Sequence, residues 1–206
     1  MRPRGSRNAS YDKRRAELLE RLTLRLCNRE TGWPTMRELA AAANCSVPTL
    51  SHYFGRREDV VRAVLHHIAV GTEDQLAATR MPEGPFEASV HAAAGRAAAA
   101  LHDPAIARML AMGLIEALSA SVLGPSFLGT MLDPFVAALA ERLDVHVAAG
   151  EMRPVDTRMA AMDIISPILL AALHQRELGG AGCNPLDAAA HATHVADGFV
   201  AAYAKR

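Results

Sequence analysis

Residues 47–54, VPTLSHYF, carry hydroxyl, imidazole and small apolar side chains at the spacing of a short helix. Leu50 and Phe54 are four residues apart and would form the buried stripe of that helix. The opposite face would then carry groups that can bond phosphate oxygens and base edges or contact a thymine methyl group. These residue types on one exposed helix face predict a DNA contact surface.

The predicted DNA contacts are Thr35, Arg37, Ser46, Val47, Pro48, Thr49, Ser51, His52, Tyr53 and Arg57. The hydroxyl groups of Thr49 and Tyr53 and the guanidinium group of Arg57 can bind phosphate oxygens. Such contacts fix the register of a protein on DNA without reading its sequence. Base edges suit Ser51 and His52, and Arg37 could reach a guanine with two hydrogen bonds. Val47 and Pro48 can meet a thymine methyl group.

Helix caps and a turn predict how these residues are held. Thr35 and Glu38 have the spacing of a capping box, which starts a helix over 36–43. Asn44 tolerates the left-handed conformation of a turn, and Ser46 caps the next helix, with Pro48 in its first turn and Gly55 at its end. An earlier amphipathic helix, capped by Asn8 or Ser10, reaches about Glu30 and ends at Thr31-Gly32. The pattern is a helix-turn-helix in a three-helix unit.

At these residues the sequence resembles the TetR family of bacterial transcription regulators. The matching pattern is a capped helix, a turn, Thr49-Leu50 with an aromatic residue three positions later, and a basic-acidic helix start at 56–59. The resemblance implies base-facing roles for Arg37, Val47, Pro48 and Ser51, and backbone roles for Thr35, Thr49, Tyr53 and Arg57. Many family members have Tyr at the position of Ser51, so the operator preference does not transfer.

The charge distribution supports this interpretation. Residues 1–60 hold 12 Lys and Arg against 7 Asp and Glu, whereas residues 61–206 hold 10 against 15. A basic module joined to an acidic remainder is typical of a protein that binds a polyanion through one part. Residues 1–9, with Arg2, Arg4 and Arg7, are predicted to be a disordered basic arm, with minor-groove binding as the alternative.

The composition predicts an all-α chain. Ala accounts for 41 of the 206 residues and aromatic residues for only 4%, which favours helices over strands. We expect about nine helices, with a DNA-binding domain over 10–55 and a ligand-binding and dimerisation domain over 56–206. The helices expected in the second domain cover 56–80, 86–101, 103–123, 127–149, 156–178 and 186–203.

The second domain is expected to pair two copies of the chain and to bind a small molecule. The last two helices are apolar over wide arcs, and the resemblance implies that they form a four-helix bundle with a second copy; burial within one subunit is the alternative. Met and Phe suit an adaptable apolar pocket, although Met at helical spacing is also ordinary core. The candidate pocket residues are His91, Met109, Met112, Ser119, Phe127, Met131, Phe135, Met162 and Ser166.

Several classes of protein are not expected. Cys27, Cys45 and Cys183 form neither a disulfide framework nor a zinc spacing, and neither cofactor nor metal is expected. The chain lacks the usual motifs of nucleophilic and phosphate-binding enzymes. No signal peptide or membrane span is expected, so the predicted location is the cytoplasm.

Together these features predict a repressor released from a palindromic operator by a small, largely apolar effector. An activator or global DNA-binding regulator of the same fold is the alternative. A helical-bundle enzyme or metal-binding protein is the more distant alternative.

Overall fold

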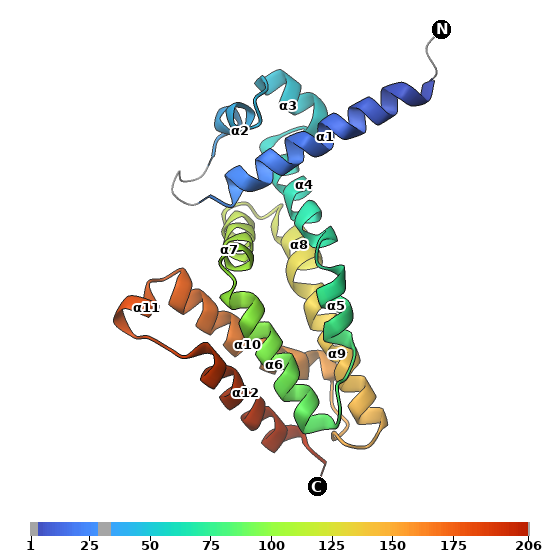
Figure 1. Cartoon of the computed structure of the whole chain (residues 1–206), viewed down its shortest axis with the longest axis vertical. Coiled ribbons are helices and arrows are strands. Elements are labelled where there is room, and N and C mark those ends of the chain that lie inside the picture. The colour runs from blue at the N-terminus through green and yellow to red at the C-terminus, as the bar shows by residue number, and fades with distance from the viewer. Residues whose placement is uncertain (1–3, 29–33, 206) are drawn as a thin grey trace. The chain divides into compact units, whose positions relative to one another are not determined.

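The computed structural model describes the backbone of residues 4–28 and 34–205, with side chains from Ala9 onward in these ranges. The described chain is helical, apart from loops and one isolated antiparallel bridge between Met152 and Ala204 (Figure 1). The all-α prediction is therefore confirmed, but the described residues form more helices than the nine or so expected. The chain forms two compact units: Met1–Val70 with Met112–Phe127, called unit 1, and Gly71–Ala111 with Leu128–Arg206, called unit 2.

Unit 1 contains the segment that carries the predicted DNA contacts. Its helices are α1 (Arg4–Leu26), α2 (Met36–Ala42), α3 (Val47–Phe54), α4 (Arg57–Val70), the end of α7 (Pro104–Ser119) and the short α8 (Gly124–Phe127). Aliphatic side chains from α1 to α4 form its core and are fully buried: Leu18, Leu22, Leu39, Leu50, Val60, Val61, Val64 and Leu65.

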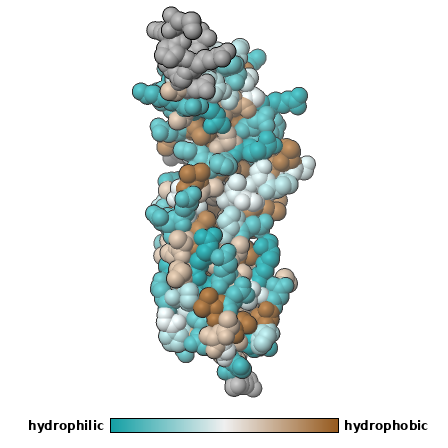
Figure 2. Space-filling view, turned by 90° about the vertical axis from the view of Figure 1, so that its right-hand side faces the viewer, coloured by the Kyte–Doolittle hydropathy of each residue, from teal (hydrophilic) through white to brown (hydrophobic). Residues whose placement is uncertain are grey.

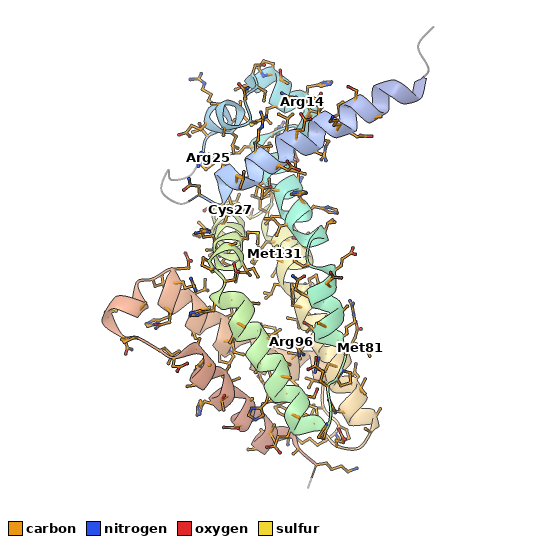
Figure 3. The ribbon with its side chains drawn as sticks, in the orientation of Figure 1. Arg14, Arg25, Cys27, Met81, Arg96 and Met131 are labelled. Atoms are coloured by element: carbon orange, nitrogen blue, oxygen red, sulfur yellow. The ribbon has the colours of Figure 1, made fainter. Side chains whose placement is uncertain are left out.

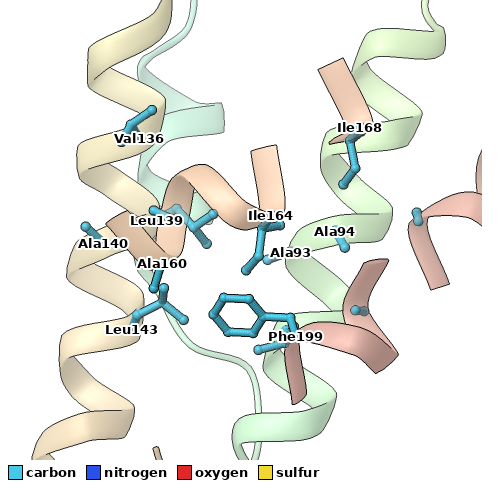
Figure 4. Packing of buried hydrophobic residues seen from close by; sticks show 14 of the residues in the cluster. Ala93, Ala94, Val136, Leu139, Ala140, Leu143, Ala160, Ile164, Ile168 and Phe199 are labelled. Atoms are coloured by element: carbon cyan, nitrogen blue, oxygen red, sulfur yellow. The ribbon is translucent and has the colours of Figure 1, made fainter. Parts of the chain in front are cut away.

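Unit 2 is a bundle of longer helices. It comprises α5 (Glu73–Arg80), α6 (Phe86–His102), the start of α7, the π-helical η2 (Leu128–Leu132), α9 (Asp133–Ala148), α10 (Thr157–Arg176), α11 (Gly180–Cys183) and α12 (Ala188–Tyr203). Figure 4 shows the Phe199 ring of α12 among buried side chains of α9, α10 and α6, such as Leu143, Ile164 and Ala93. Burial of this apolar cluster stabilises the bundle.

Local capping signals in unit 2 agree with the sequence. The Asp103 carboxylate accepts a hydrogen bond from the backbone N–H of Ala105 at 2.7 Å, at the start of α7. The Asp156 carboxylate accepts one from Met159 at 3.0 Å, at the start of α10. Each carboxylate satisfies an amide that the first helical turn leaves without a partner.

Several predicted helix boundaries are wrong. The first helix begins at Arg4, so most of the segment predicted as a disordered arm is helical backbone. The helix expected over 56–80 is divided into α4 and α5 at Gly71 and Thr72, since glycine has low helix propensity. The last helix begins at Ala188, because Asp187 rather than an earlier residue caps it. The predicted helix end at Thr31-Gly32 lies outside the described residues.

The end of α5 is held by Arg142, a fully buried arginine of α9. Its guanidinium donates to the carbonyl oxygens of Thr79 and Ala78 at 2.7 and 2.8 Å and to the hydroxyl of Ser89 at 2.8 Å. Arg96 of α6, labelled in Figure 3, also donates to the Ala78 carbonyl, at 3.4 Å. Burial lowers the pKa of Arg142. Positive charge is favourable here because a helix C-terminus is the negative end of its dipole.

The visible surface is mixed in character. Figure 2 shows apolar side chains as separate patches among hydrophilic and neutral ones. Within the described residues, α10 is the single helix long and apolar enough by itself to cross a membrane, whereas α6 and α7 meet that test only as a pair bent by 82°. Length and apolar composition alone are weak evidence for a membrane span.

Candidate nucleic-acid interface

The helix-turn-helix begins with the predicted capping box. The Thr35 hydroxyl accepts a hydrogen bond from the Glu38 backbone N–H at 3.3 Å, and the Glu38 carboxylate accepts one from the Thr35 N–H at 2.7 Å. The backbone bond from Thr35 lowers the pKa of Glu38, and the Thr35 side chain adds to the effect. These two bonds fix the first turn of α2.

The turn and the second helix also follow the predicted pattern. Asn44 has φ of 52°, in the left-handed region. The Ser46 hydroxyl accepts from the Thr49 N–H at 3.2 Å and lies 2.8 Å from the Thr49 hydroxyl. Pro48 is in the first turn of α3, and Leu50 is fully buried. The N-terminal end of α3 is therefore held by a cap, while its polar residues stay on the surface.

The side chains of the predicted DNA contacts differ in solvent exposure. Six of them have exposed side chains: Thr35, Arg37, Ser46, Pro48, Ser51 and His52. Four are partly buried: Val47, Thr49, Tyr53 and Arg57. The exposed set lies on α2, α3 and their caps, so the structure brings most of the predicted residues together on one motif.

Arg57 is directed into unit 1. Its terminal nitrogens donate to the two carboxylate oxygens of Glu116 at 2.8 and 2.5 Å, and its Nε donates to the Pro34 carbonyl at 2.9 Å. Glu116 is 1% exposed. Hydrogen bonding to Glu116 raises the pKa of Arg57, although burial opposes this. The predicted phosphate contact of Arg57 would have to compete with these bonds, and no local pattern in the sequence indicates Glu116 as its partner.

The start of α4 is capped by Asp59, whose carboxylate accepts from the Arg56 N–H at 3.0 Å and from Arg62 at 2.7 Å. Gly55 precedes it with φ of 93°, and a Cβ there would lie 2.7 Å from an oxygen of Asp59. Position 55 therefore favours glycine for its backbone conformation, and a side chain there would also displace the Asp59 carboxylate.

Tyr11 of α1 is a residue of this region that the sequence analysis missed. Its ring stacks on that of Tyr53, with centroids 4.7 Å apart and planes at 23°. Four residues along α1, the guanidinium of Arg15 lies 4.9 Å from the centre of the Phe54 ring. The four-residue spacing of Tyr11 and Arg15 was the available signal, because it places both on the helix face that continues into Leu18 and Leu22.

The candidate pocket residues are divided between the two units. Three of them, Met112, Ser119 and Phe127, belong to unit 1, and the other six belong to unit 2. Met112 and Phe127 are buried, and a Cβ on Gly113 would lie 2.8 Å from the Phe127 ring, so Phe127 is closely packed. His91 pairs with Asp197 at 3.1 Å. Met162 and Ser166 lie on the exposed side of α10.

α10 exposes an apolar stripe at helical spacing. Met159 is 67% exposed, Met162 37% and Leu170 65%. The exposed side of α12 is formed mainly by small residues, including Ala189, Ala190, Thr193, Ala201 and Ala202. Small side chains let another helix approach closely. Among the described residues, no three His, Cys, Asp or Glu side chains gather as metal ligands would.

Residues 89–205 match the model of a TetR-family C-terminal domain, that of the AefR-like transcriptional repressors. The match covers more than half of the chain. The chain belongs to the TetR family of transcriptional regulators. No curated protein matches it.

Solved structures of other TetR-family proteins share the fold of this TetR-family chain. A putative regulator from Mesorhizobium loti superposes with a TM-score of 0.75 at 17% identity, over 95% of this chain and 98% of that one. A TetR regulator from Haloarcula marismortui gives 0.70 at 16% identity, over 94% and 100%. SmeT, the repressor of the SmeDEF multidrug efflux pump of Stenotrophomonas maltophilia, gives 0.61 at 17% identity, over 93% and 90%. At these identities the similarity concerns the fold.

Proposed function

We propose that this TetR-family protein is a cytoplasmic, sequence-specific DNA-binding repressor without enzymatic activity. The observation that carries the proposal is the arrangement of α3. Its N-terminal end is capped by Ser46 and exposes Pro48, Ser51 and His52, while Leu50 anchors the other face in the core. A helix-turn-helix presents this end of its second helix to the major groove.

The proposed contacts follow chemistry and exposure. Arg37, Val47, Pro48, Ser51 and His52 read base edges and methyl groups. The DNA backbone is bound by the hydroxyl groups of Thr35, Ser46, Thr49 and Tyr53, and these contacts set the register. Arg57 is left out of this set, because its guanidinium is bonded to Glu116 and Pro34.

We propose further that the protein acts as a homodimer on a palindromic operator. The apolar stripe of α10 and the small-residue side of α12 give each copy a face that a second copy would cover. A twofold dimer would present two copies of α3 to half-sites about 34 Å apart, one turn of DNA.

We propose that a small, largely apolar molecule binds in unit 2 and releases the DNA. Met109, Met131 and Phe135 are half-buried there and offer adaptable apolar contacts. The molecule would act through a higher affinity for the conformation that does not bind the operator.

DNA binding is tested with duplexes that the wild-type protein selects from a random pool, at one fixed salt concentration. Tyr53→Phe should weaken binding to all duplexes to a similar degree, since it removes a backbone contact. Arg37→Ala should relax preference at one base position by about 1–3 kcal/mol. Failure of the wild type to prefer any sequence would contradict the proposal. A reporter gene placed behind the selected duplex distinguishes repression from activation.

The dimer is tested by sedimentation equilibrium. Leu170→Glu should convert the dimer to a monomer, because it places a charge in the apolar stripe. Leu24→Glu is the matched control, since Leu24 is 74% exposed on α1 and should leave the dimer intact. A wild-type monomer at micromolar concentration would contradict the dimer. For the effector, a compound screen on the selected complex should yield one that releases DNA from the wild type and not from Phe135→Arg.

A further inference from the structure

Three aromatic side chains join α1 to the exposed end of α3; we call Tyr11, His52 and Tyr53 the aromatic cluster. The Tyr11 and Tyr53 rings stack at 4.7 Å. The His52 ring meets both at steep angles, 89° to Tyr11 at 6.1 Å and 77° to Tyr53 at 5.5 Å. Offset stacking and edge-to-face contacts are the favourable geometries of aromatic pairs.

A second contact reinforces the cluster from the same face of α1. Arg15, one turn after Tyr11, places its guanidinium over the ring of Phe54, the residue after Tyr53. Two successive turns of α1 therefore hold two successive residues of α3. Leu18 and Leu22 continue this face into the core of unit 1, where both are fully buried. The position of Tyr11 is thus fixed by a rigid helix.

The cluster lies among the proposed DNA contacts, because His52 and Tyr53 both belong to that set. A tyrosine on a helix surface ordinarily samples several rotamers, and fixing one of them costs binding energy. Stacking on Tyr11 restricts the Tyr53 ring before DNA arrives. Such preorganisation raises affinity without a new contact to the ligand.

We propose that Tyr11 is a positioning residue for DNA recognition, which holds Tyr53 in its DNA-binding orientation through the ring stack. This inference rests on the proposed function and deepens it. It extends the functional part of unit 1 from the helix-turn-helix to α1. The ring of Tyr11, rather than its hydroxyl group, carries the role.

Fluorescence anisotropy with the duplex selected by the wild type tests the proposal. Tyr11→Ala should weaken binding about three- to tenfold, the range expected for one aromatic pair. Tyr11→Phe keeps the ring and should bind like the wild type. In a Tyr53→Ala background, Tyr11→Ala should change affinity by less than about twofold, because its partner is already absent. Leu24→Ala, on the exposed side of α1, is the control.

Three results would overturn this proposal while leaving the proposed function intact. Wild-type affinity of Tyr11→Ala would show that the stack has no role in binding. An equal loss for Tyr11→Phe, or an undiminished loss in the Tyr53→Ala background, would show that Tyr11 contacts DNA directly. If the wild type selects no duplex, the proposed function fails and this inference fails with it. That outcome differs from one in which the wild type binds a selected duplex and the Tyr11→Ala variant binds it equally well.

Ring-labelled tyrosine NMR tests the stack without DNA. The chain has three tyrosines, at 11, 53 and 203, so their ring signals are easily assigned. Tyr11→Ala should shift the ring signals of Tyr53 and leave those of Tyr203 in unit 2 unchanged. An unchanged Tyr53 signal would contradict the stack. Should Tyr11→Ala lower the thermal midpoint, Tyr11→Leu replaces it in both experiments, since Leu retains apolar volume without a ring.

Discussion

The guanidinium of Arg57 joins the buried carboxylate of Glu116 to the backbone carbonyl of Pro34. One side chain therefore links the start of α4, the end of α7 and the residue before the capping box of α2. The two partners are not equivalent. The side chain of Arg57 is 27% exposed and could turn toward water, whereas that of Glu116 is 2% exposed and could not.

This asymmetry predicts unequal costs for the two single variants. Arg57→Ala leaves a buried carboxylate without its partner and should lower the free energy of unfolding by about 3–5 kcal/mol. Glu116→Ala leaves an arginine that can reach solvent and should cost about 1–3 kcal/mol. The double variant should be more stable than Arg57→Ala alone. Urea unfolding at neutral pH measures all three, and equal losses for the two single variants would contradict the asymmetry.

Two helical glycines should respond oppositely to alanine. A Cβ on Gly95 of α6 meets nothing within 4 Å, so Gly95→Ala should raise the free energy of unfolding by about 0.5–1 kcal/mol. A Cβ on Gly113 of α7 would lie 2.8 Å from the ring of Phe127 and 3.1 Å from Leu65. Gly113→Ala should therefore cost about 1–3 kcal/mol through overpacking. Thermal unfolding of the pair gives the comparison, and a gain at both positions would refute the close packing in unit 1.

The capping box should make stability depend on pH. The pKa of Glu38 is held below its ordinary value of 4.5 by hydrogen bonds from Thr35. The ionised Glu38 carboxylate therefore contributes to the free energy of unfolding at pH values above 4.5. This contribution is lost as the pH falls through the lowered pKa that Glu38 has in the folded protein. Urea unfolding from about pH 6 to about pH 3 should show a shallower decline for Glu38→Gln than for the wild type. Thr35→Ala should lose about 1 kcal/mol at neutral pH. Identical pH profiles for Glu38→Gln and the wild type would exclude the charged cap.

Arg142 should control the opening of α5. Replacing it by Met keeps apolar volume but removes the donor to the Thr79 carbonyl and the shorter of the two bonds to the Ala78 carbonyl, so α5 should detach more often. Limited trypsin digestion should cut after Arg80 about tenfold faster than in the wild type, which corresponds to about 1.4 kcal/mol. Arg96→Met is the matched control and should have a smaller effect, since Arg96 makes one longer bond to α5. Equal cleavage rates for Arg142→Met and the wild type would contradict this role.

The features of unit 1 that could be predicted from the sequence are short-range ones. Thr35 with Glu38, the left-handed Asn44, the Ser46 cap and the buried Leu50 are each set within a few residues, and all appear as expected. The high alanine content and the low aromatic content of the chain likewise sufficed for the all-α class.

The features that sequence could not predict join distant segments. Arg57 was assigned to phosphate from its charge and position, but its partner Glu116 lies 59 residues away. The ring of Tyr11 stacks on Tyr53 of α3, and this contact can be predicted only when the packing of α1 against α3 is known. The pocket candidates were chosen by residue type alone, which cannot separate the closely packed Phe127 from a residue that lines a cavity.

The bonds of Arg142 also set an order of events when the chain is made. α5 has no buried side chain of its own, and the donor to its last turn lies 63 residues further along than Thr79. A chain emerging from the ribosome from its N-terminus therefore exposes α5 well before the residue that secures it has been synthesised. Unit 1 is likewise incomplete until residues 112–127 have emerged, whereas the core of unit 2 also needs Phe199 of α12 and so closes only near the end of synthesis.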